Sequence, residues 1–163
     1  MTITQAMPKT TLSPGSLLVL LGDYVGRTTT CLPLADPGRT ARTYDLLELS
    51  DDLEIWAIHW PKDQGLELHD HGGSSGALWV VEGSLSEHVV AADGRLERRV
   101  LSAGLGSAFG PTHVHDVINR HAAPATSIHA YSPPMSSMTF YRAHGTRLVA
   151  DRTEYRADPS WAP

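Results

Sequence analysis

Two histidines one residue apart are the first side chains in this sequence that could do chemistry. His69 and His71 stand in the stretch ELHDHGGSSGALWVVEG, ahead of a glycine-rich turn and an apolar run. On a β-strand, side chains two residues apart point to the same face, so both imidazoles would project together while Asp70 points away. Two imidazoles in that arrangement can hold one metal ion, although the same spacing is also typical of an ordinary pair on a strand.

A second pair of histidines, His113 and His115, lies in HVHDVIN. This stretch resembles the end of the second conserved motif of the cupin superfamily, H-x3-N, with His115 and Asn119 in the two named slots. Strand alternation alone lets either histidine, or both, face a site. The motif register favours His115 as a ligand and leaves His113 as a residue of the pocket or its rim.

The first histidine pair fits the first cupin motif. His69 and His71 fill its two histidine slots, and Gly83 fills its closing glycine. Gly76 occupies the slot of the usual glutamate ligand and has no side chain that could bind a metal. The predicted metal site therefore consists of three neutral histidines, His69, His71 and His115, with no anionic protein ligand.

A third group of polar residues lies in SIHAYSPP. Ser127, His129 and Tyr131 are spaced at i, i+2 and i+4, so on a strand all three share one face and can form a hydrogen-bonded row. Same-face neighbours on one strand suit a proton relay better than an attacking serine, so a hydrolase triad is not expected. Taken alone, the pattern also fits a core strand with a buried tyrosine.

Composition and charge limit the class of protein. At 163 residues the chain is most simply one domain, and its net charge of -5 without a basic block argues against a nucleic-acid surface. Cys31 is the single cysteine, so no intramolecular disulfide can form, and we expect a small core residue there rather than a nucleophile. No signal peptide or membrane span is recognisable, which predicts a cytoplasmic protein.

Short apolar or alternating runs recur from Glu54 onward, separated by Gly, Pro, Asp or Ser, at intervals of about 8 to 12 residues typical of an all-β sandwich or barrel. Asp93-Gly94 between two such runs predicts a hairpin. Before the strands, we expect a short helix after Pro14 and a second one in RTYDLLEL, residues 42–49. Residues 1–50 thus form a predicted N-terminal extension on a barrel of residues 51–163. We expect the tail after Ala150 to pack as an edge strand and then to fray.

These three motifs, in this order and at these separations, resemble the cysteine dioxygenase family, the thiol dioxygenases of the cupin superfamily. The resemblance covers about residues 44–141. It implies an all-β cupin fold, a small jelly-roll barrel with a short N-terminal helical segment, and a cis Ser132-Pro133 bond. It also implies iron(II) held by the three histidines, with Ser127, His129 and Tyr131 as the outer row. Gly76 resembles the bacterial members, which lack the cysteine that crosslinks to the tyrosine in animal enzymes, so Tyr131 should be unmodified.

The activity implied by the resemblance is the conversion of a small thiol to its sulfinic acid with O2. Cysteine-specific members bind the substrate carboxylate through an arginine, whose position here corresponds to Tyr44. Arg42, one step away on the same strand face, and Arg142 are the candidates to replace it. The substrate is therefore cysteine or a mercapto-acid, and the expected partners are this small molecule and O2, with no nucleic acid and no membrane, in a monomer or small homo-oligomer.

Two other functions remain open at this point. The first is a cupin metalloenzyme, a dioxygenase or isomerase, that acts on a small molecule other than a thiol; Tyr44 in the arginine position keeps this alternative. The second is a non-catalytic cupin that binds a metal or ligand. The row of Ser127, His129 and Tyr131 argues against the second, because a binding protein does not need an oriented phenol.

Overall fold

The computed structural model describes residues 11–28, 38–158, 161 and 163. This part of the chain contains one helix, α1 (Pro14–Thr28), followed by strands only. The strands are β1 (Thr43–Leu49), β2 (Glu54–Trp60), β3 (Gly65–His69), β4 (Ser75–Glu82), β5 (Ser84–Val90), β6 (Leu96–Ser102), β7 (Gly106–Phe109), β8 (His115–Ile118), β9 (Ala125–Ser132), β10 (Ser137–His144) and β11 (Arg147–Tyr155). The predicted all-β fold with a short N-terminal helix is confirmed.

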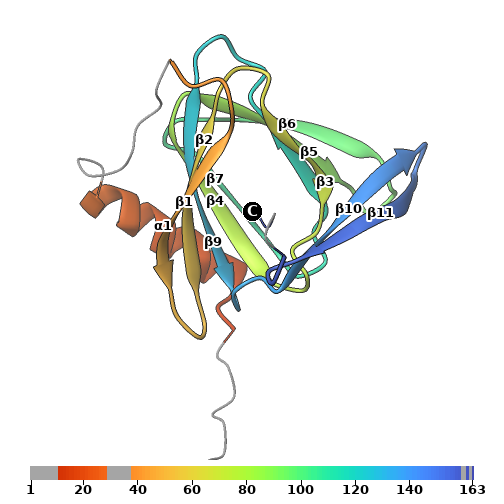
Figure 1. Ribbon diagram of the computed structural model, residues 1–163, viewed down its shortest axis with the longest axis horizontal. Coiled ribbons are helices and arrows are strands. Elements are labelled where there is room, and N and C mark those ends of the chain that lie inside the picture. Colours follow the sequence, from red (N-terminus) through yellow and green to blue (C-terminus); the bar gives the residue numbers. More distant parts are fainter. Residues whose placement is uncertain (1–10, 29–37, 159–160, 162) are drawn as a thin grey trace, which may run out of the picture.

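Two antiparallel sheets face each other and enclose the core, as Figure 1 shows. One sheet has the order β1-β2-β9-β4-β7 and the other β11-β10-β3-β8-β5-β6. Residues that alternate along β2 and β9 point into this space, and they include Trp56, Ile58 and Trp60 on β2 and Tyr131 on β9. The candidate histidines come from the six-stranded sheet and the Ser127 row from the five-stranded one, so any site they form lies between the sheets.

Helix α1 covers the outer face of the five-stranded sheet (Figure 1). Ser13 caps the helix, because its hydroxyl accepts from the Ser16 N–H at 3.1 Å, and Pro14 stands at the first helical position. Leu17 and Leu21, one turn apart, are fully buried against outward-facing residues of the sheet, Ile55, Ala77, Ile128 and Ala130. No helix in the described ranges is long and apolar enough to cross a membrane.

The second predicted helix is wrong: residues 43–49 form strand β1, which pairs antiparallel with β2. The reason lies in a shift of register, where Leu46 pairs with Trp56 but Glu48 pairs with Ile55. One residue of β1 between these pairs has no partner on β2, so the apolar residues of this strand do not alternate strictly along the sequence. Their spacing therefore resembles that of a helix.

The other local predictions agree with the structure. Asp93-Gly94 joins β5 and β6 in a hairpin, with Gly94 at a φ of 81°, where a side chain would collide with the Thr146 carbonyl. Strand β11 lies at the edge of the six-stranded sheet, and the Ser132-Pro133 bond is cis. The prediction for Cys31 lies outside the described residues. The division of the chain at residue 50 stays a prediction.

Candidate metal centre

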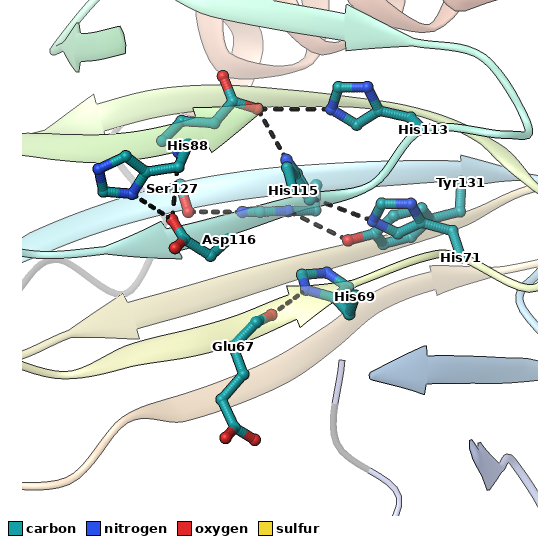
Figure 2. A network of polar contacts seen from close by, with 11 residues as sticks. Glu67, His69, His71, His88, His113, His115, Asp116, Ser127 and Tyr131 are labelled. Carbon is teal, nitrogen blue, oxygen red and sulfur yellow. Dashed lines mark hydrogen bonds and ion pairs between the residues drawn. The ribbon is translucent and has the colours of Figure 1, made fainter. Parts of the chain in front are cut away.

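Three histidines from neighbouring segments of the six-stranded sheet converge between the sheets (Figure 2). His69 ends β3, His71 follows it in the turn, and His115 begins β8. The pairing of β3 with β8 sets His69 directly opposite His115. All three side chains are almost completely buried. Two sequence motifs about 45 residues apart are thus brought together by one strand pairing.

The geometry of these imidazoles suits a single metal ion. One ring nitrogen from each lies within 4.8 Å of the other two, and the Nε2 atoms of His71 and His115 face each other at 3.2 Å. Nitrogen ligands about 2.0–2.1 Å from a common ion stand roughly 3 Å apart, so the separation between His71 and His115 fits. Three imidazoles suit iron, zinc, copper or nickel.

Burial keeps these histidines neutral. Loss of solvent lowers the pKa of His69, His71 and His115. The charge that His115 would carry lowers the pKa of His69 and His71 further, and that of His113 lowers the pKa of His115. At His115 the nearby Glu87 opposes this shift without reversing it. Neutral imidazole is the form that coordinates a metal, so the unprotonated ligand set is available at neutral pH.

The Nδ1 atoms of the three rings have different partners. His69 donates from Nδ1 to the backbone oxygen of Glu67 at 2.7 Å, and His115 donates to the Glu87 carboxylate at 2.7 Å. The Nδ1 of His71 is buried and has no hydrogen-bond partner in the described part of the chain. Instead the His71 ring packs against both Phe109 and Tyr131, with centroids at 4.6 and 5.3 Å, and these two rings also contact each other at 6.4 Å.

His113 belongs to a second group beside the first. Its ring stacks on Phe109 at 4.7 Å, and its Nε2 lies 3.9 Å from the Glu87 carboxylate, away from the three converging nitrogens (Figure 2). Burial raises the pKa of Glu87, but the facing imidazoles of His113 and His115 outweigh it and lower the pKa to about 2. Strand alternation allowed either His113 or His115 to face the site, but in the structure only His115 joins His69 and His71.

Gly76 stands on β4 where the Phe109 ring fills the adjacent space. A Cβ at Gly76 would lie 2.3 Å from the Phe109 ring and 3.1 Å from the Tyr131 ring. Glycine is therefore a packing requirement at this position, because any side chain there would displace the ring that stacks on His71. A crosslinking cysteine does not fit beside Tyr131 unless Phe109 moves.

Ser127, His129 and Tyr131 do form one hydrogen-bonded row on β9. Ser127 Oγ lies 2.8 Å from His129 Nε2, and His129 Nδ1 lies 3.2 Å from the Tyr131 hydroxyl. Trp60 extends the row, because its indole N–H donates to Ser127 Oγ at 2.8 Å. Each of these side chains is almost completely buried.

The indole N–H of Trp60 can only donate, so Ser127 Oγ accepts it. Among the contacts of the described residues, the Ser127 hydroxyl proton then has His129 Nε2 as its acceptor. In the His129 tautomer that accepts this proton, Nδ1 donates to the Tyr131 oxygen and the phenol proton stays free; the directions of both bonds depend on this tautomer. Burial, and then the charges of His115 and Arg42, lower the pKa of His129 to about 3, while burial raises that of Tyr131. Tyr131 therefore remains a neutral hydrogen-bond donor.

The two predicted arginines lie in different places. Arg42 lies just before β1, half-buried, with its guanidinium 5.4 Å from the Trp60 ring centroid and 5.8 Å from that of Tyr44. Its positive charge lowers the pKa of His129 and opposes the rise at Tyr131, which puts it near the row. Tyr44 is 38% exposed and packs on Trp56.

Arg142 lies on the outer hairpin formed by β10 and β11. Its side chain is 70% exposed and pairs with Asp151 at 3.0 Å. The structure does not bring it to the histidines. Arg42, by contrast, donates to the backbone oxygen of Pro163 at 2.7 Å, and Pro163 is buried between the sheets, where Figure 1 marks the C-terminal end.

Sequence reasoning did not find Glu87 or Trp60. Both are contributed by strands, β5 and β2, other than those that carry the residues they contact. The signal for Glu87 was a carboxylate inside the buried strand SLSEHVV, where an unpaired charge is expensive. For Trp60 no local signal distinguishes a hydrogen-bonded indole from an ordinary core tryptophan.

Solved structures with the same fold are distant in sequence. TT1209 from Thermus thermophilus aligns with a TM-score of 0.54 at 21% identity over 62% of this chain and 91% of its own. A recombinant oxalate oxidase in complex with glycolate aligns at 0.55, 13% identity, and 66% and 59% coverage. The cupin domain of an XRE family transcriptional regulator from Enterobacter cloacae aligns at 0.50, 18% identity, and 58% and 99% coverage. These similarities confirm the predicted cupin fold.

The family follows from the sequence match rather than from these structures. The family described as cysteine dioxygenase type I matches residues 32–144. This range includes all three converging histidines, the row on β9 and Arg42. It also contains Glu87 and Trp60, which the motifs alone did not indicate. The chain belongs to the cysteine dioxygenase type I family, within the cupin fold.

Proposed function

We propose that the protein is a mononuclear non-haem iron(II) thiol dioxygenase that converts a small thiol to its sulfinic acid. The overall reaction is R–SH + O2 → R–SO2H, in which the sulfur is oxidised and both oxygen atoms are retained in the product. The observation that carries this proposal is the convergence of three buried, neutral imidazoles next to the phenol of Tyr131, in a chain of the cysteine dioxygenase type I family.

His69, His71 and His115 would hold the iron. When bound, iron(II) would supply the redox chemistry that activates dioxygen, and its charge would lower the pKa of a substrate thiol from about 8.5. The three protein ligands bring no negative charge, so an anionic thiolate is favoured at this site. His71 is buried and packs against the rings of Phe109 and Tyr131, which limit the access of water to it.

Arg42 would bind the carboxylate of the substrate. Its guanidinium contacts the rings of Tyr44 and Trp60, and it donates a hydrogen bond to the backbone oxygen of Pro163. A substrate carboxylate could accept the same hydrogen bond. Arg142 is the alternative, and its exposure and pairing with Asp151 make it the weaker one. A carboxylated thiol, cysteine or a mercapto-acid, is therefore the proposed substrate.

Tyr131 would donate a hydrogen bond from its phenol to the substrate bound beside His71. With His129 protonated on Nδ1, the row from Trp60 through Ser127 and His129 leaves the phenol proton unused by the described residues. A fixed donor aimed at developing negative charge on substrate oxygen stabilises it without reorganisation. In this proposal His129 and Ser127 act by orienting the phenol.

The proposed partners are the thiol and O2. We propose that the protein works in the cytoplasm as a monomer or small homo-oligomer, without a nucleic-acid or membrane partner. The net charge of -5 supports the exclusion of nucleic acid.

Oxygen uptake by the iron-loaded protein tests the proposal. Cysteine, 3-mercaptopropionate and cysteamine would be compared, with mass detection of a product that has gained two oxygen atoms. We expect the two carboxylated thiols to be oxygenated with a lower KM than cysteamine. Absence of a dioxygenated product with every thiol, from protein shown to contain iron, would refute the proposal.

Three arginine variants test the substrate contact. Arg42→Ala should raise KM for carboxylated thiols by about 10-fold or more, as expected when a charge-assisted hydrogen bond is lost, and should change cysteamine little. Arg42→Lys should recover part of the loss. Arg142→Ala is the matched surface control, and an effect there equal to that of Arg42→Ala would transfer the role to Arg142.

A further inference from the structure

Glu87 is a carboxylate buried beside the third histidine. It lies on β5 in the six-stranded sheet, its side chain is 0% exposed, and its Oε1 accepts the His115 Nδ1 proton at 2.7 Å. Its Oε2 is also buried and has no hydrogen-bond partner in the described part of the chain. Burying a carboxylate is costly unless its charge is compensated, so a half-satisfied one calls for an explanation.

The strand pairing explains how Glu87 reaches the site. Strand β5 pairs with β8, which sets Val89 opposite His115 and Glu87 opposite Val117. Glu87 and Val89 lie on the same face of their strand, and the longer glutamate side chain reaches across to the His115 ring. The contact is therefore built into the centre of the sheet rather than made by a mobile surface group.

Glu87 also distinguishes His115 from the other two histidines. His69 is supported by a backbone oxygen, which carries only a partial charge, and the Nδ1 of His71 has no partner in the described residues. A carboxylate on the far nitrogen of a ligating imidazole fixes the ring and its tautomer and increases the basicity of the near nitrogen. Of the three rings, only that of His115 is seen to receive this support in the described structure.

We infer that Glu87 is a positioning residue for the metal: it holds the His115 ring with Nε2 toward the ion and supplies the compensating negative charge that the three neutral ligands lack. His113, stacked on Phe109 with its Nε2 3.9 Å from the carboxylate, confines Glu87 from the other side. The inference rests on the proposed metal site of His69, His71 and His115. It does not depend on which reaction the metal performs.

A second arrangement must be separated from this one. Ligand atoms of Glu87, His113 and His115 also lie within 4.8 Å of one another, so Glu87 could be a direct ligand in that group. A direct role would make His113 as important as Glu87. A positioning role makes His113 secondary and leaves His69 and His71 indispensable.

Metal affinity measured by competition with a chromophoric chelator, using Co²⁺ as the probe, tests the inference. Glu87→Ala should weaken Co²⁺ binding by about 10- to 100-fold, the usual effect of removing such a carboxylate. Glu87→Gln keeps an oxygen acceptor for His115 and removes the charge, so its loss should be smaller. His113→Ala should weaken binding by less than Glu87→Ala does.

Glu67→Gln is the matched control. Glu67 contacts His69 through its backbone oxygen, while its side chain points away from the histidines and bonds Arg152 at 2.8 Å (Figure 2). This variant changes a carboxylate only two residues from a ligand in sequence but directed away from the site, and its Co²⁺ affinity should equal that of the wild type. Thermal unfolding without metal identifies any Glu87 variant that loses its fold, in which case the milder Glu87→Gln decides.

Two results would overturn the inference. Unchanged Co²⁺ affinity in folded Glu87→Gln and Glu87→Ala would remove the positioning role, and equal losses in His113→Ala and Glu87→Ala would indicate direct ligation instead. The ligand-field spectrum of bound Co²⁺ should keep its band positions in Glu87→Gln, because the ligand atoms are the same. If the wild type binds Co²⁺ in this way but oxygenates no thiol, the proposed function fails while this inference stands.

Discussion

The indole N–H of Trp60 donates to the hydroxyl oxygen of Ser127 at 2.8 Å, inside the five-stranded sheet. The two residues lie on adjacent strands, β2 and β9, and face the same side. Because an indole never accepts, Ser127 Oγ is the acceptor in this contact, and among the described residues the Ser127 proton is left with His129 Nε2 as its acceptor. With His129 protonated on Nδ1, the Tyr131 oxygen accepts from His129 and the phenol keeps its own proton free to donate.

Replacing Trp60 should make the phenol of Tyr131 a weaker hydrogen-bond donor. Trp60→Phe keeps an aromatic ring under Arg42 but removes the N–H, so the Ser127 proton is no longer confined to His129. We expect kcat for thiol oxygenation to fall by about 5-fold, as for the loss of one buried hydrogen bond, with little change in KM. Tyr131→Phe should cost more. The control is Trp79→Phe, since Trp79 packs on the helix side of the sheet; equal kcat values in both tryptophan variants would contradict the assignment.

Gly76→Ala should destabilise the protein because its Cβ would collide with the Phe109 ring at 2.3 Å. Overpacking of this kind costs about 1–3 kcal/mol, measurable by denaturant unfolding of the metal-free protein. Gly110→Ala is the control, because a Cβ there meets nothing within 4 Å. Adding Phe109→Leu to Gly76→Ala should recover part of the loss. A Gly76→Ala variant as stable as the wild type would show that the Phe109 ring can move aside without a loss of stability.

Removal of the chain beyond Asp158 should ease binding of carboxylated substrates. Pro163 offers its backbone oxygen to Arg42 at 2.7 Å, so a substrate carboxylate must displace that contact. We expect the shortened protein to show a lower KM for 3-mercaptopropionate and an unchanged KM for cysteamine, which has no carboxylate. Oxygen-uptake kinetics measure both values. An equal change for the two thiols would assign the C-terminal residues a general role in access to the site instead.

Acid should destabilise the metal-free protein through His129. Its pKa is lowered to about 3 in the folded state from an ordinary value near 6.5, so below pH 6.5 the unfolded state binds a proton that the folded state rejects. Stability therefore falls as the pH drops from 6.5 toward 3, by at most about 1.4 kcal/mol per pH unit from this residue. In chemical unfolding, His129→Gln should show a shallower decline over that range; an identical slope would contradict the assignment.

Local spacing in the sequence was enough for part of the fold and part of the site. The alternation of strand residues predicted the β-barrel, the Asp93-Gly94 hairpin and the shared face of Ser127, His129 and Tyr131, because each depends on residues a few positions apart. It failed at residues 43–49, where pairing with β2 and a shift of register overrode a pattern that resembled a helix. The sequence also could not decide which of Tyr44, Arg42 and Arg142 lies near the histidines to bind the substrate, because this depends on the position of each residue's strand in the fold.

The sequence by itself determined which residue types could form a metal site and a relay, since those motifs are short and each lies within one segment. Only the tertiary structure decided what surrounds them: His69 faces His115 through the pairing of β3 with β8, Glu87 reaches His115 from β5, and Trp60 reaches Ser127 from β2. The physical reason is that side-chain periodicity is a property of one strand. Register between strands far apart in sequence is fixed by the packing of the whole barrel.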